Sequence, residues 1–268
     1  MKKFSSLLHN LILTPSRNTK IKLLQDYFKI LDINRAYALA ILSDQLSFQF
    51  IKASKLRELV YEQVDQHLFD YSYDYVGDLA ETISLIWPTK KEGKSQNLST
   101  LIENIKKIKK SEINTEFSKV LSELSNNERW TLIKICTGGL RIGVSERLVK
   151  TALADLYNKS VNEIEEIWHG LEFPYENLFQ WLKNETSKPK IDFKKLFHPM
   201  MLANPIDEEK DFKRLDANEF QAEYKWDGIR VQLMVSSNSV SLYSRTGDNI
   251  SSAFPEIIEN TKGDAVID

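Results

Sequence analysis

The apolar residues of this chain change their spacing once along its length. Up to about residue 190 they recur every three or four positions, as in the stripe of Ile21, Leu24 and Phe28, which is typical of helices with one buried face. Closer to the C-terminal end they alternate with polar residues, as at residues 229–235 and 240–243, which is typical of half-buried strands. The pattern predicts an all-helical region followed by a smaller mixed α and β region.

Capping residues indicate where several helices begin and end. Asp78 can cap a helix that Pro88 terminates, and an apolar helix that contains Trp130 is expected to stop at Gly138. The tyrosine-rich stretch at residues 71–77 has turn character, and we expect a packing corner there rather than a metal loop.

Composition is that of an ordinary globular protein, with 42% hydrophobic and 28% charged residues. His9 and Asn10 interrupt the apolar start of the chain, so an export signal is not expected, and no stretch is long enough to span a membrane. The single cysteine, Cys136, suits a reducing cytoplasm, and the four histidines lack metal-ligand spacing. We therefore expect a cytoplasmic protein.

The two parts of the chain differ in charge. Residues 197–268 hold 7 Lys and Arg against 13 Asp and Glu, whereas residues 1–196 hold 29 against 25. The first part is therefore the side expected to meet phosphates. A basic cluster at residues 106–110 is most simply the solvated face of a helix, with a phosphate patch as the alternative.

One lysine near the C-terminal end has neighbours suited to covalent chemistry. Lys225 follows an alternating run and is expected at the end of a strand, where burial and cationic neighbours would lower its pKa from about 10.4 and free the amine for attack on phosphorus or carbon. Asp227 can accept a hydrogen bond, Arg230 can bind phosphate or ribose oxygens, and Glu223, on the same strand face as the lysine, can meet donors on a base. The alternative is a simple turn between two strands, with an exposed lysine before it.

A glycine-flanked turn joins two helices at residues 137–145. Such a turn places backbone amides and Arg141 at helix ends, where a DNA phosphate can approach closely. The alternative is an ordinary helical hairpin whose glycines end the first helix.

The segment Glu223-Tyr224-Lys225-Trp226-Asp227-Gly228-Ile229-Arg230 resembles motif I of the covalent nucleotidyltransferases, in the form found in ATP-dependent DNA ligases. The resemblance implies that Lys225 forms a phosphoramidate with AMP, that Glu223 recognises adenine, and that Arg230 contacts ribose and the nick phosphate. Asp227 would either orient the lysine or support the sealing step. Arg245 lies in a segment that matches the next ligase motif, whose arginine contacts the 5′-phosphate; the alternative is a plain arginine at a strand end.

The turn at residues 137–146, Thr-Gly-Gly-Leu-Arg-Ile-Gly-Val-Ser-Glu, resembles part of the all-helical DNA-binding domain that precedes the catalytic core in archaeal, eukaryotic and some bacterial ATP-dependent DNA ligases. Residues 75–82 are similar to another segment of that domain. The resemblance implies that Gly139, Arg141 and Gly143 contact the minor groove beside a nick, independently of base sequence.

The resemblance covers the whole chain and implies its domain organisation. Residues 1–190 are expected to form the all-helical DNA-binding domain, and residues 191–268 the N-terminal portion of an α+β adenylation domain that opens at residues 197–203. The chain is expected to stop within motif III, before the oligonucleotide-binding-fold domain, with a final strand that lacks neighbours.

The implied activity is ATP-dependent sealing of nicks in duplex DNA through a lysyl-AMP intermediate and an adenylated 5′-phosphate. ATP and Mg²⁺ or Mn²⁺ are the implied cofactors, with the metal ligands unknown, and nicked double-stranded DNA is the implied partner; a sliding clamp or repair nuclease is not determinable. As it stands, the chain is expected to bind DNA and not to ligate. The alternatives are a non-catalytic DNA-binding module and an RNA ligase or capping-type nucleotidyltransferase, which is not expected to carry the helical domain.

Overall fold

The computed structural model describes residues 1–30, 34–46, 50–88, 95–138, 140–168, 170–190, 197–198, 200–201, 203–221, 223–236, 239–245 and 249–268. The chain divides into two compact units: residues 1–165 with 172–188, and residues 166–171 with 189–268. Up to residue 188 its elements are α1 (Lys2–Leu13), α2 (Arg17–Phe28), α3 (Asn34–Leu42), α4 (Ala53–Tyr61), α5 (Gln66–Val76), α6 (Leu79–Ile86), α7 (Leu98–Lys106), η1 (Lys110–Glu112), α8 (Ile113–Glu123), α9 (Asn126–Thr137), α10 (Glu146–Tyr157), α11 (Val161–Trp168) and α12 (Glu176–Leu182). Beyond residue 188 they are α13 (Glu208–Asp211), η3 (Ala217–Glu219), β1 (Val231–Ser236), β2 (Ser239–Ser244), η4 (Ser251–Ala253), α14 (Pro255–Asn260) and β3 (Ala265–Ile267).

The helix boundaries predicted from capping residues are confirmed. The Asp78 carboxylate accepts a hydrogen bond from the backbone N–H of Glu81 at 2.9 Å and begins α6. Gly138, with a φ of 71°, ends α9, and Ser145 caps α10. None of the described helices is long and apolar enough to cross a membrane.

The turn predicted for the tyrosine-rich stretch is wrong, because residues 66–76 form the helix α5 and only Gly77 leaves it. Asp65 caps this helix by accepting from the backbone N–H of Leu68 at 3.0 Å, and Phe69 anchors it in the core. Tyr75 is 92% exposed, so the stretch is no packing corner. The Asp65 cap and the burial of Phe69 therefore outweigh the local preference of this stretch for a turn.

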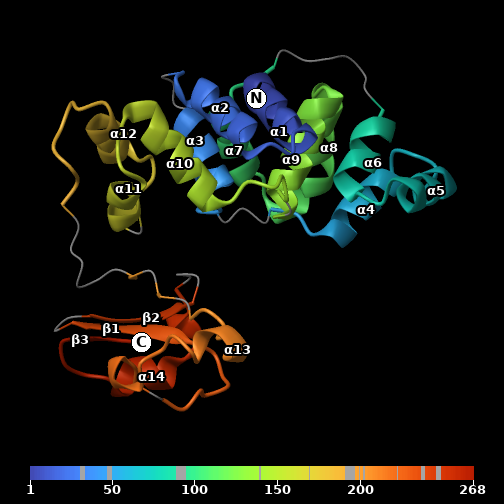
Figure 1. Cartoon of the computed structure of the whole chain (residues 1–268). Helices are drawn as coiled ribbons and strands as arrows, with labels where there is room; N and C mark the ends of the chain where they lie inside the picture. The colour runs from blue at the N-terminus through green and yellow to red at the C-terminus, as the bar shows by residue number, and fades with distance from the viewer. Residues whose placement is uncertain are drawn as a thin grey trace. The chain divides into compact units, whose positions relative to one another are not determined.

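The helix α9 lies at the centre of the first unit. It contacts α1 and α6, while α10 contacts α2 and α3 (Figure 1). Both faces of α9 are buried, with Leu132, Ile133 and Cys136 fully enclosed. Because α9 is packed on several sides, its C-terminal end has a well-defined position in this unit.

A buried arginine connects α9 to two other helices. Arg129 has no exposed surface, and its guanidinium donates to the carbonyl oxygens of Leu121 (2.8 Å), Leu124 (2.8 Å) and Ser84 (2.8 Å). Burial lowers the pKa of Arg129 to about 10, which leaves the side chain charged at neutral pH. The arginine thereby satisfies carbonyls near the C-terminal ends of α6 and α8 that those helices cannot satisfy themselves.

The second unit contains an antiparallel sheet with the strand order β2-β1-β3 (Figure 1). The strands predicted at residues 229–235 and 240–243 are confirmed as β1 and β2, whose buried residues include Met234, Val235 and Leu242. The prediction that the last strand lacks neighbours is wrong. β3 pairs with β1 over three residues, because the edge of β1 away from β2 is open to a further strand.

Gln232 fastens the segment that precedes this sheet. The backbone N–H of His198 donates to its side-chain oxygen at 2.7 Å, and its side-chain nitrogen donates back to the His198 carbonyl at 3.0 Å. Phe197 is buried, with its ring centre 5.8 Å from that of Tyr243. The described residues of the expected domain opening are thus attached to β1 and β2.

We expect Arg129→Met to destabilise the first unit by about 3 kcal/mol, because it leaves buried carbonyls without donors. Arg129→Lys should recover only part of the lost stability, since an ammonium cannot donate hydrogen bonds in the planar, forked geometry of a guanidinium. The measurement is urea unfolding followed by far-UV circular dichroism.

The matched control is Arg147→Met, because the Arg147 side chain is 77% exposed. This change should alter the free energy of unfolding by no more than about 0.5 kcal/mol. Equal effects of the Arg129 and Arg147 substitutions would contradict a structural role for the buried guanidinium.

Candidate functional site

The turn between α9 and α10 has an unusual backbone. Gly138, Arg141 and Gly143 have φ values of 71°, 32° and 65°, in the left-handed region that side chains other than glycine rarely adopt. Arg141 is exposed, whereas the next residue, Ile142, is buried and anchors the turn. Gly139, a predicted DNA contact, lies outside the described residues. The turn therefore presents an exposed guanidinium and exposed backbone at a fixed place.

A lysine from α2 supports the far end of this turn. The Lys20 ammonium donates to the carbonyl oxygen of Gly143 at 2.8 Å, across 123 positions of sequence. A Cβ atom on Gly143 would lie 2.8 Å from this ammonium, which can move, so the positive φ is the stronger reason for glycine. No local pattern points to Lys20, because its partner is distant in sequence.

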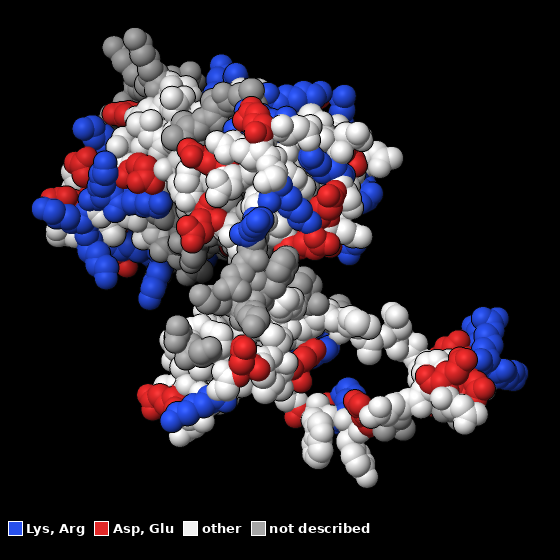
Figure 2. Space-filling model, turned by 90° about the vertical axis from the view of Figure 1, so that its left-hand side faces the viewer, with Lys and Arg blue, Asp and Glu red and all other residues white. Residues whose placement is uncertain are grey.

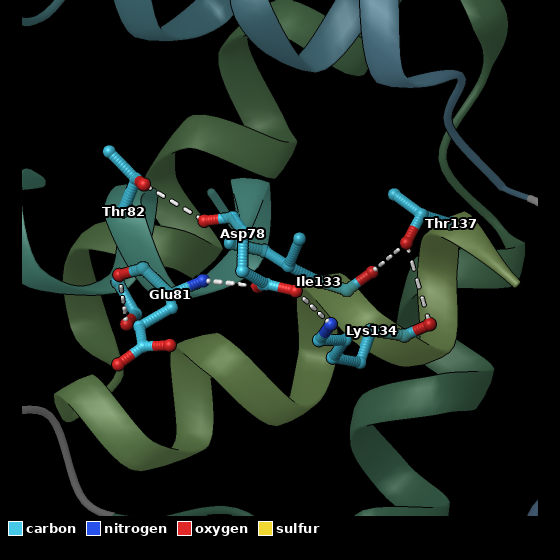
Figure 3. A network of polar contacts seen from close by, with 7 residues as sticks. Asp78, Glu81, Thr82, Ile133, Lys134 and Thr137 are labelled. Atoms are coloured by element: carbon cyan, nitrogen blue, oxygen red, sulfur yellow. Dashed lines mark hydrogen bonds and ion pairs between the residues drawn. The ribbon is translucent and has the colours of Figure 1, made fainter. Parts of the chain in front are cut away.

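An ion pair supports the other end of the turn (Figure 3). The Lys134 ammonium, in the last turn of α9, lies 2.5 Å from a carboxylate oxygen of Asp78. Burial raises the pKa of Asp78, but hydrogen bonds from Lys134 and from the Glu81 backbone outweigh it and hold this pKa below its ordinary value. The sequence predicts Asp78 only as a cap; an isolated lysine within the apolar run at residues 131–136 is the signal for its second role.

On the face displayed in Figure 2, charge alone does not define a DNA surface. Figure 2 shows basic side chains interspersed with acidic ones on the face it displays, rather than a continuous basic area.

Lys225 does not have the predicted surroundings. Residues 223–230 contain no strand, and the Lys225 side chain is 86% exposed. Its ammonium donates to Asp227, itself 91% exposed, at 2.6 Å. The predicted strand and burial are wrong because Phe220 and Tyr224, the described apolar residues of the alternating run, are both exposed and have nothing to pack against.

The other motif residues bind separate partners. Glu223 accepts from the side-chain nitrogen of Gln221 at 3.0 Å. Arg230 donates to the Asp268 carboxylate at 2.8 and 2.5 Å and to the carbonyl oxygen of Met201 at 2.8 Å. The hydrogen bond raises the pKa of Arg230 and lowers that of Asp268. Because residues 223–230 contain no strand, the prediction that Glu223 shares a strand face with the lysine is also wrong.

The described side chains of the lysine motif and Arg245 are not gathered in a closed pocket. Lys225 and Asp227 are too exposed to lie in a pocket, and Arg245, just after β2, is exposed as well. Among the described residues, no group of three or more His, Cys, Asp and Glu side chains is arranged to hold a metal ion. The described side chains of the motif are therefore not enclosed around a space for a nucleotide.

Two family models match the chain. One, described as "DNA ligase N terminus", matches residues 1–154, and the other, described as "ATP dependent DNA ligase domain", matches residues 200–268. The first match includes the turn between α9 and α10, and the second includes Lys225.

Curated relatives agree with these matches. The chain is 37% identical to a DNA ligase of Nitrosopumilus maritimus over 147 residues, which are 53% of the chain and 25% of that protein. It is 33% identical to a probable DNA ligase of Koribacter versatilis over 152 residues, 53% of the chain and 24% of that protein. A DNA ligase of Thermococcus fumicolans is 25% identical over 197 residues, 68% of the chain and 35% of that protein. The chain thus spans only a quarter to a third of the length of these relatives. Together, the family models and the relatives show that the chain belongs to the family of ATP-dependent DNA ligases.

Proposed function

We propose that this chain is the DNA-binding part of an ATP-dependent DNA ligase together with the beginning of its adenylation domain, acting in the cytoplasm on the nucleoid. Residues 1–190 would bind nicked duplex DNA, and residues 191–268 would begin the catalytic domain. The observation that carries this proposal is the turn between α9 and α10, with its left-handed residues held by Lys20 at one end and by the Asp78–Lys134 pair at the other.

The turn would contact DNA through its backbone and one side chain. Gly139 and Gly143 lack side chains that would keep a sugar-phosphate strand away, and the exposed Arg141 can donate to phosphate oxygens. Contacts of this kind position a duplex without reading its bases. They suit a protein that must act at nicks in any sequence.

The roles proposed for the second unit rest on the family resemblance of their motifs. Lys225 would carry AMP in the whole ligase, with Asp227 orienting it or supporting the sealing step, and Glu223 would recognise adenine. Arg230 would contact the ribose and the nick phosphate, and Arg245 would contact the 5′-phosphate of the nick. ATP and Mg²⁺ or Mn²⁺ are the proposed cofactors of the whole ligase.

A non-catalytic DNA-binding module is the second candidate. The exposure of Lys225 and the engagement of Arg230 by Asp268 favour it, because neither side chain is arranged for catalysis. An RNA ligase or capping-type enzyme is less consistent with a match of residues 1–154 to a DNA ligase N-terminal model.

We expect Arg141→Ala to weaken binding to a nicked duplex about tenfold and to reduce the salt dependence of binding by about one phosphate contact. Fluorescence anisotropy with two nicked duplexes of unrelated sequence measures this, and both should respond equally. Lys119→Ala, which removes an exposed charge from α8, is the matched control and should have little effect. Equal losses in both variants, or a loss limited to one base sequence, would count against the proposed contact.

We expect no covalent AMP adduct when the chain is incubated with radiolabelled ATP and Mg²⁺, because the Lys225 side chain is 86% exposed and pairs only with an exposed carboxylate among the described residues. The full-length DNA ligase of Nitrosopumilus maritimus serves as the positive control, and Lys225→Ala as the negative control. A labelled product that disappears in Lys225→Ala would overturn this expectation and exclude the non-catalytic module.

A further inference from the structure

A groove of about 690 Å³ opens between the start of α4 and the turn that joins α7 to α8. Its apolar lining consists of Phe50, Ile51, Ile108 and Ile113. The backbone N–H of Ile51 donates to the carbonyl oxygen of Cys136 at 3.3 Å, and the ring centre of Phe50 lies 5.6 Å from that of Phe117. The floor of the groove is therefore attached to the core, and Phe50, Ile108 and Ile113 keep part of their surface accessible.

Basic side chains surround this apolar floor. Lys52, Lys55, Lys106 and Lys110 line the groove, against the single acidic residue Glu58. Lys55 pairs with Glu58 at 2.8 Å, and Lys106 pairs with Glu103 at 3.0 Å. Lys52 and Lys110 are exposed, come from different walls, and have no acidic partner in the part of the chain that the structure describes. The groove therefore carries excess positive charge.

The basic cluster at residues 106–110 contributes one wall of the groove. The expectation that it forms one helical face is wrong beyond Lys106, where α7 ends, and Lys110 begins η1. This break in the helix turns Ile108 and Lys110 toward the same groove. An apolar residue and a lysine that a continuous helix would separate thus line one surface.

The lining distinguishes between two kinds of anionic partner. A nucleic-acid strand would need basic groups for its phosphates and aromatic rings on which bases stack. Phe50 is the one aromatic residue among the described groove residues, and its ring already packs against Phe117. An apolar floor between lysines instead suits a peptide with large apolar side chains on one face and carboxylates beside them. The volume lies within the range of roughly 300–1,000 Å³ that is usual for binding pockets.

We propose that this groove docks an acidic amphipathic segment of a partner protein. Apolar side chains of the segment pack on Phe50, Ile108 and Ile113, and its carboxylates pair with Lys52 and Lys110. The proposal does not depend on nick sealing, because none of these residues belongs to the turn or to the lysine motif. Binding of this kind weakens as salt concentration rises.

The test uses a phage library that displays random peptides, each long enough for about four helical turns. Peptides are selected for binding to the whole 268-residue chain. Phage that also bind the double variant Lys52→Glu/Lys110→Glu are discarded. We expect the selected peptides to be rich in Asp and Glu, with pairs of large apolar residues at helical spacing. Anisotropy with the synthetic peptides should show affinity that falls about tenfold in the double variant and in Ile108→Ser.

The control is Lys22→Glu/Lys119→Glu, which reverses two exposed charges outside the groove and should leave the affinity of the peptides unchanged. Melting temperatures verify that all variants fold. The proposal is overturned if no peptide distinguishes the wild-type chain from the groove variant, or if the control weakens binding equally. It is also overturned if a single-stranded oligonucleotide displaces the peptides and loses affinity in the same groove variant, since the groove would then be a nucleic-acid site.

Discussion

The arrangement of the first unit depends on a positive charge enclosed among helix ends. The Arg129 guanidinium donates to carbonyl oxygens near the C-terminal ends of α6 and α8, while its own backbone lies in the first turn of α9. A charge in the interior is costly, and its pKa is lowered by burial accordingly. Several hydrogen bonds and the negative ends of two helix dipoles offset this cost. Three helices therefore meet at one place in the first unit.

This junction determines where the proposed DNA contact lies. Arg129 fixes the beginning of α9, the Asp78–Lys134 pair fixes its end, and both attach it to α6. The turn that follows is then held from the other side by Lys20 of α2. A turn that contacts DNA without reading its bases must be placed correctly against the sugar-phosphate backbone. The residues that hold the turn in place are therefore as important as the turn itself.

The sequence predicts features that depend on neighbours along the chain. The cap at Asp78, the end of α9 at Gly138, and two alternating strands could all be read from local patterns and were found as predicted. The contacts of Arg129 with Ser84 and of Lys20 with Gly143 could not be predicted, because the partners come from distant segments. At the candidate site, Lys225 shows the same difference between what local sequence predicts and what distant segments determine. Its motif identifies the proposed chemistry, but burial of a lysine requires a surrounding surface that residues 223–230 do not supply.

Among the described residues, no further strand pairs with β3 in the small sheet of the second unit, whereas residues 249–251 cover part of the outer edge of β2. The strand order places β2 and β3 outermost, and on β3 Val266 and Ile267 remain 49% and 52% exposed. Neither a lysine nor a proline interrupts β3, the usual means by which proteins discourage unwanted strand addition. A strand from a second molecule can thus extend the hydrogen-bonding ladder as readily as one from the same polypeptide. In concentrated solution, this edge is where association between molecules would begin.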